Sequence, residues 1–248
     1  MRTANPALNK KTFVGFTPVT DTDRVMTIQG TVNKTGLMLL ILLFSATWTW
    51  NLFFETGTPG AVMPWVIGGA VGGLIVALVT VFKKPWAAVT SPVYALLEGL
   101  FLGGLSAIFE AQYPGIVIQA VALTFGTLFS LLLAYKSRLI KVTENFKLGV
   151  AAATGGIFLI YIANFLLGFF GIQMPFIHES GIFGIGFSLV VVVIAALNLV
   201  LDFDFIENGA AGGAPKYMEW YAAFGLMVTL IWLYLEMLRL LAKLRSRD

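Results

Sequence analysis

The sequence predicts an all-α, polytopic membrane protein that folds as a bundle of seven transmembrane helices. Of its 248 residues, 58% are hydrophobic and only 12% are charged, whereas about 25% of the residues in an ordinary soluble domain are charged. The mean hydropathy is +0.87, and a chain of this size cannot keep so much apolar surface in water. The apolar residues also gather in runs of about 20, the length that crosses the roughly 30 Å hydrocarbon core of a bilayer.

Turn and charge signals separate these apolar runs along the chain. "KKPW" precedes the third run, "YPG" the fourth, and the glycine-rich "NGAAGGAPK" the seventh. Because the connections are short, we expect neighbouring helices to run antiparallel in one bundle. The predicted spans are residues 35–54, 61–82, 89–109, 115–135, 148–170, 181–203 and 217–241.

The first 34 residues differ in character from the rest of the chain. They are polar and lack the apolar run of a signal peptide. We interpret residues 1–34 as an N-terminal cytoplasmic tail, partly disordered, and residues 35–248 as the seven-helix transmembrane domain. With no sorting signal in the sequence, the bacterial plasma membrane is the default location.

Basic residues in short loops predict the orientation of the helices, because they remain on the cytoplasmic side. Lys83 and Lys84 follow the second span, and four basic residues follow the fourth, whereas the alternate loops "ETGTPG", "EAQYPG" and "GIQMPFIHES" have no Lys or Arg. The N-terminus is therefore expected in the cytoplasm. Seven crossings then place the C-terminus outside although it carries Arg239, Lys243, Arg245 and Arg247, and we prefer seven crossings to an incomplete last helix.

Several kinds of site are excluded by the residues present. The chain has no cysteine and one histidine, His178, so thiolate sites, histidine zinc sites and histidine-dependent triads cannot form. No nucleophile–base set is apparent, and we expect neither an enzyme nor a bound cofactor. The basic residues cluster at the ends of spans, which indicates membrane topology rather than nucleic-acid binding.

Five acidic residues lie within or at the very edge of the predicted spans, and four of them are the candidate functional residues: Glu98, Asp202, Asp204 and Glu236. An acid at mid-bilayer costs about 2.5–3.5 kcal/mol on insertion scales, so a deep one requires a partner, a proton or water. Glu219, only just inside its span, is expected to be solvated. We also weighed simple solvation for Asp204 and an i,i+3 ion pair with Arg239 for Glu236.

Glu98 and Asp202 are predicted to lie at similar depths from the cytoplasmic face, where they could meet. Two carboxylates in a low-dielectric site cannot both ionise cheaply, so such a pair can share a proton and separate when it is lost. This arrangement would be a pH switch. Asp202 could instead reach water at the helix end, and Glu98 could be a packing partner only.

The stretches "LVLDFDFI", "WLYLEMLRLL" and "PGIVIQAVALTFGTLFSLLLAY" resemble the transmembrane Bax-inhibitor-motif proteins, and the seven-span layout is similar over residues 35–245. The resemblance implies a proton-regulated calcium leak in which an aspartate late in the sixth helix pairs with one in the seventh. The first aspartate corresponds to Asp202. The second corresponds to Glu236 if the motif is matched, or to the non-titratable Thr229 if the separation is matched, which leaves Glu98 as a further candidate partner.

Two hypotheses of function follow. The first is a pH-sensitive cation leak channel with Ca²⁺ as the transported ion, gated by protonation of the intramembrane carboxylates, since carboxylate oxygens are hard ligands suited to calcium. Here Asp204 and Glu207 attract cations to the cytoplasmic mouth, and Asp202, Asp204 and Glu207 form a weak, transient Ca²⁺ site. The alternative is a non-conducting interaction protein that modulates other membrane proteins, such as a membrane protease.

Overall fold

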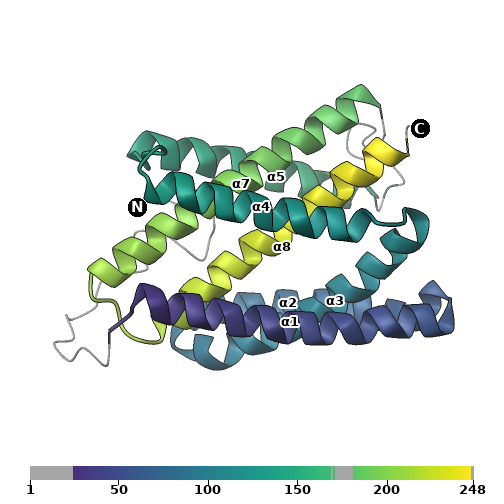
Figure 1. The fold of residues 1–248 in the computed structure, drawn as a ribbon, viewed down its shortest axis with the longest axis horizontal. Helices are drawn as coiled ribbons and strands as arrows, with labels where there is room; N and C mark the ends of the chain where they lie inside the picture. The colour runs from purple at the N-terminus through teal and green to yellow at the C-terminus, as the bar shows by residue number, and fades with distance from the viewer. Residues whose placement is uncertain (1–24, 169, 171–180, 247–248) are drawn as a thin grey trace. The chain divides into compact units, whose positions relative to one another are not determined.

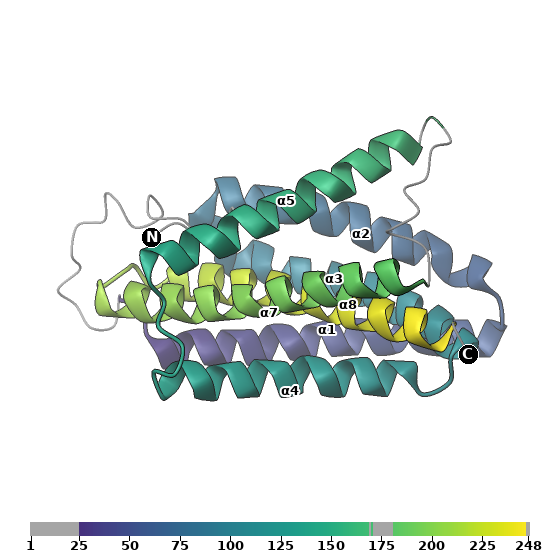
Figure 2. The ribbon, with the colours of Figure 1, turned by 90° about the horizontal axis from the view of Figure 1, so that it is seen from above.

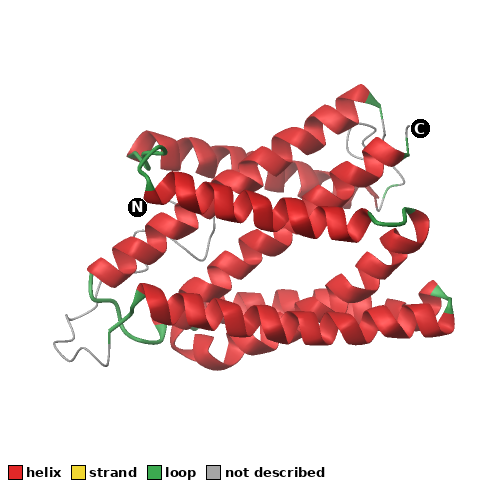
Figure 3. Ribbon diagram, in the orientation of Figure 1, coloured by secondary structure: helices red, strands yellow, loops and turns green. Residues whose placement is uncertain are grey.

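A computed structural model describes residues 25–168, residue 170 and residues 181–246 of the chain. Within these residues the chain is helical, without strands, and its seven long helices are joined by short loops (Figures 1 and 3). The helices are α1 (Ile28–Thr56), α2 (Pro59–Phe82), α3 (Ala87–Gln112), α4 (Ile116–Lys136), α5 (Glu144–Gly168), α7 (Ile182–Ala211) and α8 (Met218–Arg245), and a short 3-10 turn, η3 (Lys84–Trp86), precedes α3.

The predicted fold class is confirmed. All seven helices are long and apolar enough to cross a membrane, and large side chains such as Phe44 and Phe82 are 80% exposed on the protein surface. Such exposure would be costly in water but suits a surface that faces lipid.

The helix ends differ from the predicted spans. α1 begins at Ile28 rather than near residue 35, and α7 continues to Ala211 rather than ending near residue 203. Hydropathy marks the part of a helix that lies in lipid, whereas backbone hydrogen bonds continue through polar residues at either end. Most of the predicted tail, residues 1–24, lies outside the described residues, as does His178.

Local signals explain where helices start and stop. The Thr27 hydroxyl accepts a hydrogen bond from the Gly30 backbone N–H and so caps the start of α1. Gly57, with φ of 65°, ends α1 in the left-handed conformation, where a side chain would be strained. Gly115 and Gly213 adopt the same conformation in the turns that precede α4 and α8.

The chain forms two compact units. Among the described residues, one unit, here called the α1–α3 unit, comprises residues 25–114 and 205–228; the other, the α4–α5 unit, comprises residues 115–168, 170, 181–204 and 229–246. The residues of α7 and α8 are therefore divided between the two units.

In the α1–α3 unit, α3 packs against both α1 and α2 (Figure 1). The spacing of small residues in the sequence explains these contacts. A Cβ added at Gly69 would overlap the backbone of α3, and one added at Gly99 or Gly103 would overlap the backbone of α1. Helices in lipid associate through such close packing, because lipid supplies no hydrophobic drive between them.

In the α4–α5 unit, polar side chains make many of the contacts between helices. Asn198 on α7 donates a hydrogen bond to the Thr154 hydroxyl on α5 at 2.8 Å. Lys243 on α8 donates to the Ser188 hydroxyl on α7, and these two helices run side by side in Figure 2. The ring of Tyr135 on α4 contacts that of Phe203 on α7. The helices of this unit are therefore joined by polar contacts as well as by apolar packing.

Candidate functional site

Asp202 is the most deeply buried acid of the α4–α5 unit. Its exposed fraction is 1%, and neither of its carboxylate oxygens has a hydrogen-bond partner among the described residues. The polar group that interacts with this carboxyl is the hydroxyl of Thr229 on α8, in a geometry outside that of a hydrogen bond. A buried polar group without a hydrogen bond is rare in folded proteins, and its burial is costly.

Asp202 does not lie at the end of its helix. α7 continues for nine residues beyond it, to Ala211, which corresponds to about 14 Å of helix at 1.5 Å per residue. The alternative that Asp202 reaches water at a helix end therefore does not fit this structure. The residue lies inside the protein, within a helix long enough to span a membrane.

Asp204 forms an ion pair with Lys147, at the start of α5, over 2.8 Å. The lysine side chain is 6% exposed and the aspartate side chain 15% exposed, so both are largely removed from solvent. Lys147 also lies 3.6 Å from the exposed carboxylate of Glu144. Asp204 is therefore held by a cation of the chain itself rather than simply solvated.

Glu236 forms the i,i+3 ion pair with Arg239 that was one of the two interpretations of the sequence. Arg239 donates from Nη1 to both carboxylate oxygens, at 2.7 and 2.9 Å, and Glu236 is 2% exposed. The hydroxyl of Tyr161 on α5 joins the pair: it donates to Glu236 at 3.0 Å and accepts from Arg239 at 2.7 Å. The residue that α8 presents to Asp202 is thus Thr229 rather than Glu236.

Glu98 lies in the α1–α3 unit and is 9% exposed. Its carboxyl interacts with the Tyr94 hydroxyl one helical turn earlier, and the ring of Tyr94 packs edge-on against Phe224 at 4.9 Å. A Cβ at Gly73 of α2 would collide with the Glu98 carboxyl, so this glycine makes room for the acid. Since Glu98 and Asp202 belong to different units, their pairing stays a prediction.

Glu207 is exposed near the end of α7. Across the described residues no group of three or more acidic or histidine side chains is placed to hold a metal ion. The weak Ca²⁺ site suggested for Asp202, Asp204 and Glu207 therefore also remains a prediction.

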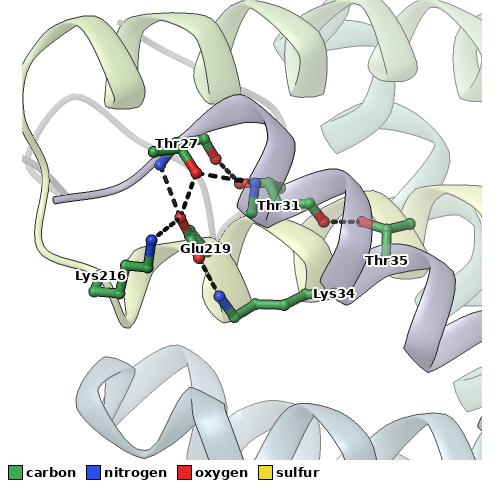
Figure 4. Close-up of polar contacts among 7 residues, drawn as sticks. Thr27, Thr31, Lys34, Thr35, Lys216 and Glu219 are labelled. Atoms are coloured by element: carbon green, nitrogen blue, oxygen red, sulfur yellow. Dashed lines mark hydrogen bonds and ion pairs between the residues drawn. The ribbon is translucent and has the colours of Figure 1, made fainter. Parts of the chain in front are cut away.

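The expectation that Glu219 is solvated is wrong. Its side chain is fully buried, and its carboxylate accepts hydrogen bonds from the backbone N–H and the hydroxyl of Thr27, at 2.9 and 2.7 Å (Figure 4). Lys34 and Lys216 pair with the same carboxylate. Figure 4 shows the carboxylate surrounded by donors from the start of α1 and from the turn that precedes α8. Gly30 leaves the space that the carboxylate fills.

Sequence reasoning missed two partners of these acids, Lys147 and Tyr161, whereas Thr229 had been named as the residue that matches the family's second aspartate by separation. Lys147 was taken only as a charge that sets orientation, and Tyr161 was not singled out. A signal was nevertheless present, because Lys147, Thr154 and Tyr161 recur every seven residues in α5 and place polar groups on one face of an otherwise apolar helix.

Residues 5–246 match a protein-family model described as "Bax inhibitor 1 like". The match covers nearly the whole chain and confirms the resemblance drawn from the motifs around Asp202 and Glu236. No match to an individual curated protein is found.

Proposed function

The chain belongs to the Bax inhibitor 1 like family, and from this membership and the buried carboxyl of Asp202 we propose that it is a pH-sensitive leak pathway for Ca²⁺. The pathway runs through the helix bundle and is gated by protonation of intramembrane carboxylates. Protons are the regulating ligand and calcium is the transported ion.

The observation that carries this proposal is the environment of Asp202. An ionised carboxylate that is 1% exposed and makes no hydrogen bond to the described residues is costly to maintain. Loss of its proton therefore favours any rearrangement that brings water or a cation to the carboxylate. A group of this kind couples the proton concentration to the opening of the bundle, as a gate requires.

The other acids have supporting roles in this proposal. Glu98 is a second titrating acid, and Asp204 and Glu207 draw cations to the cytoplasmic mouth. Asp204 does so once Lys147 releases it. Glu236 is the least favoured titrating group, because Arg239 and Tyr161 already bind its carboxylate.

The test is radiolabelled Ca²⁺ uptake by proteoliposomes, scanned from mildly acidic to mildly alkaline pH. Wild type is compared with Asp202→Asn, Glu98→Gln and the matched control Glu55→Gln, an exposed acid near the end of α1. We expect flux in the wild type and in the control to vary with pH, and Asp202→Asn to abolish that variation.

Wild-type pH dependence retained in Asp202→Asn would refute the assignment of the gate. Absence of flux at every pH, in protein shown to be folded, would refute the leak itself. That result would favour the alternative, an interaction protein that modulates a membrane protease or another membrane protein. Co-purification of partner proteins from membranes would then test this alternative.

A further inference from the structure

The α4–α5 unit contains six polar side chains spaced along two helices, here called the polar seam. On α5 its members are Lys147, Thr154 and Tyr161, and on α8 they are Thr229, Glu236 and Lys243. Each set recurs every seven residues, and residues seven apart lie on the same face of a helix. Four of the six are at most 5% exposed, namely Lys147, Thr229, Glu236 and Lys243.

Both sets contact α7, and one contact joins them to each other. Lys147 binds Asp204 and Thr154 binds Asn198, both on α7, and Tyr161 binds Glu236 on α8. At the far end, Lys243 donates to the backbone oxygen of Gly184 at 3.0 Å and to the Ser188 hydroxyl at 2.9 Å.

The seam has the length of a membrane crossing. Asp204 and Gly184, the residues that the two lysines contact, lie twenty positions apart on α7. This separation is a rise of about 30 Å, which is close to the thickness of the hydrocarbon core of a bilayer.

The charges of the seam are incompletely paired. Asp204 is bound by Lys147 and Glu236 by Arg239, but Asp202 and Lys243 have no salt-bridge partner within the described part of the chain. Lys243 is 5% exposed, and its ammonium group donates to two neutral oxygen atoms of the described residues. Glu236 acts on Lys243 only at a distance, and a buried ammonium that no carboxylate contacts is costly, so its position calls for an explanation beyond stability.

We propose that the polar seam is the cation route of this protein and that the ammonium groups of Lys147 and Lys243 close its two ends. Each lysine holds a positive charge among oxygen atoms, the surroundings that a transiting metal cation would require. Lys147 occupies the carboxylate oxygens of Asp204, and Lys243 occupies the carbonyl of Gly184 and the hydroxyl of Ser188.

The chemistry of an ammonium ion suits this role. It is a compact cation on a flexible four-carbon stem, so it can withdraw along its stem when the local charge balance changes. While it is in place, it repels a second cation across a partly desolvated site, where charges interact strongly. This inference rests on the proposed leak function and names the residues that keep the leak low.

The experiment measures Ca²⁺ flux into proteoliposomes for Lys147→Met, Lys243→Met and the double variant. We expect the double variant to raise the flux by about tenfold, since removing positive charge from a partly desolvated path lowers the electrostatic barrier to a cation. Lys141→Met, which removes an exposed lysine of the loop before α5, is the matched control and should stay near wild type. Gel filtration confirms that each variant is folded, and Lys147→Gln and Lys243→Gln replace any methionine variant that is not.

A second measurement does not depend on conduction. In detergent, Ca²⁺ should raise the thermal unfolding midpoint of the double variant more than that of wild type, because a ligand stabilises the state that binds it. If wild type and variants carry no flux at any pH, the proposed leak function is refuted. A larger Ca²⁺-dependent increase in the unfolding midpoint of the double variant would still support the proposal that the lysines occupy a cation site. If wild type conducts and the double variant shows neither greater flux nor a larger rise, the lysine closure alone is refuted.

Discussion

Replacing Glu219 tests the cluster at the start of α1 most directly. The carboxylate accepts two hydrogen bonds from Thr27 and pairs with Lys34, whose side chain is 18% exposed, and with Lys216, which is 47% exposed. Each hydrogen bond to a charged group contributes roughly 1.5–3 kcal/mol. An exposed pair such as that with Lys216 contributes less than about 1 kcal/mol because solvent screens it.

We therefore expect Glu219→Ala to lower the free energy of unfolding by about 3–5 kcal/mol, the usual cost of leaving a buried ion without its partner. Glu219→Gln keeps an acceptor for Thr27 and should lose about 2 kcal/mol, since the charge on Lys34 is then uncompensated. Reversible unfolding by SDS in mixed micelles measures the difference. Tryptophan fluorescence can report it, because Lys34 lies over the ring of Trp220 at 5.5 Å.

The control is Glu55→Gln, a change to an exposed acid at the other end of α1, which should leave stability unaltered. The free energy of unfolding of Glu219→Ala could instead lie within about 0.5 kcal/mol of the wild-type value, the range of an ordinary surface change. In that case the cluster does not stabilise the start of α1, and the reasoning fails.

Two further changes test packing within single units. Gly103→Val should prevent recovery of monodisperse protein, because even a Cβ at Gly103 overlaps the main chain of α1. The control Gly60→Ala places its Cβ where no atom lies within 4 Å, so this variant should express normally. Equal yields of the two variants would contradict the glycine contact. Tyr161→Phe should cost about 1 kcal/mol in SDS unfolding, since its hydroxyl bridges Glu236 and Arg239. An unchanged midpoint would show that the hydroxyl contributes nothing.

The sequence predicted the number and type of the helices because a helix needs about 20 apolar residues to cross a bilayer, and each run of that length can be recognised in the sequence. It did not predict their ends. The run from Asp202 to Ala211 is polar enough to end an apolar segment, yet its backbone stays helical. Asp202 was therefore expected near the end of a helix, where it could meet water, and it is instead buried with helix on both sides.

Among the candidate residues, only contacts local in sequence were foreseen. The pair of Glu236 and Arg239 is three residues apart, and helical geometry alone brings it together. The partners of Asp204 and Glu219 come from other helices, and no spacing rule places Lys147 beside Asp204 or Thr27 beside Glu219. Such contacts depend on which helices pack together, and a single sequence leaves that open.

The inward face of α5 has a consequence for handling the protein outside a membrane. Val150 and Ile157 are the buried apolar residues described on this helix, so its attachment depends on Lys147, Thr154 and Tyr161. Hydrogen bonds and ion pairs weaken where water competes for their atoms. A well-hydrated micelle should therefore loosen α5 before the glycine-packed α1, α2 and α3, and lipid nanodiscs are the better medium in which to study it.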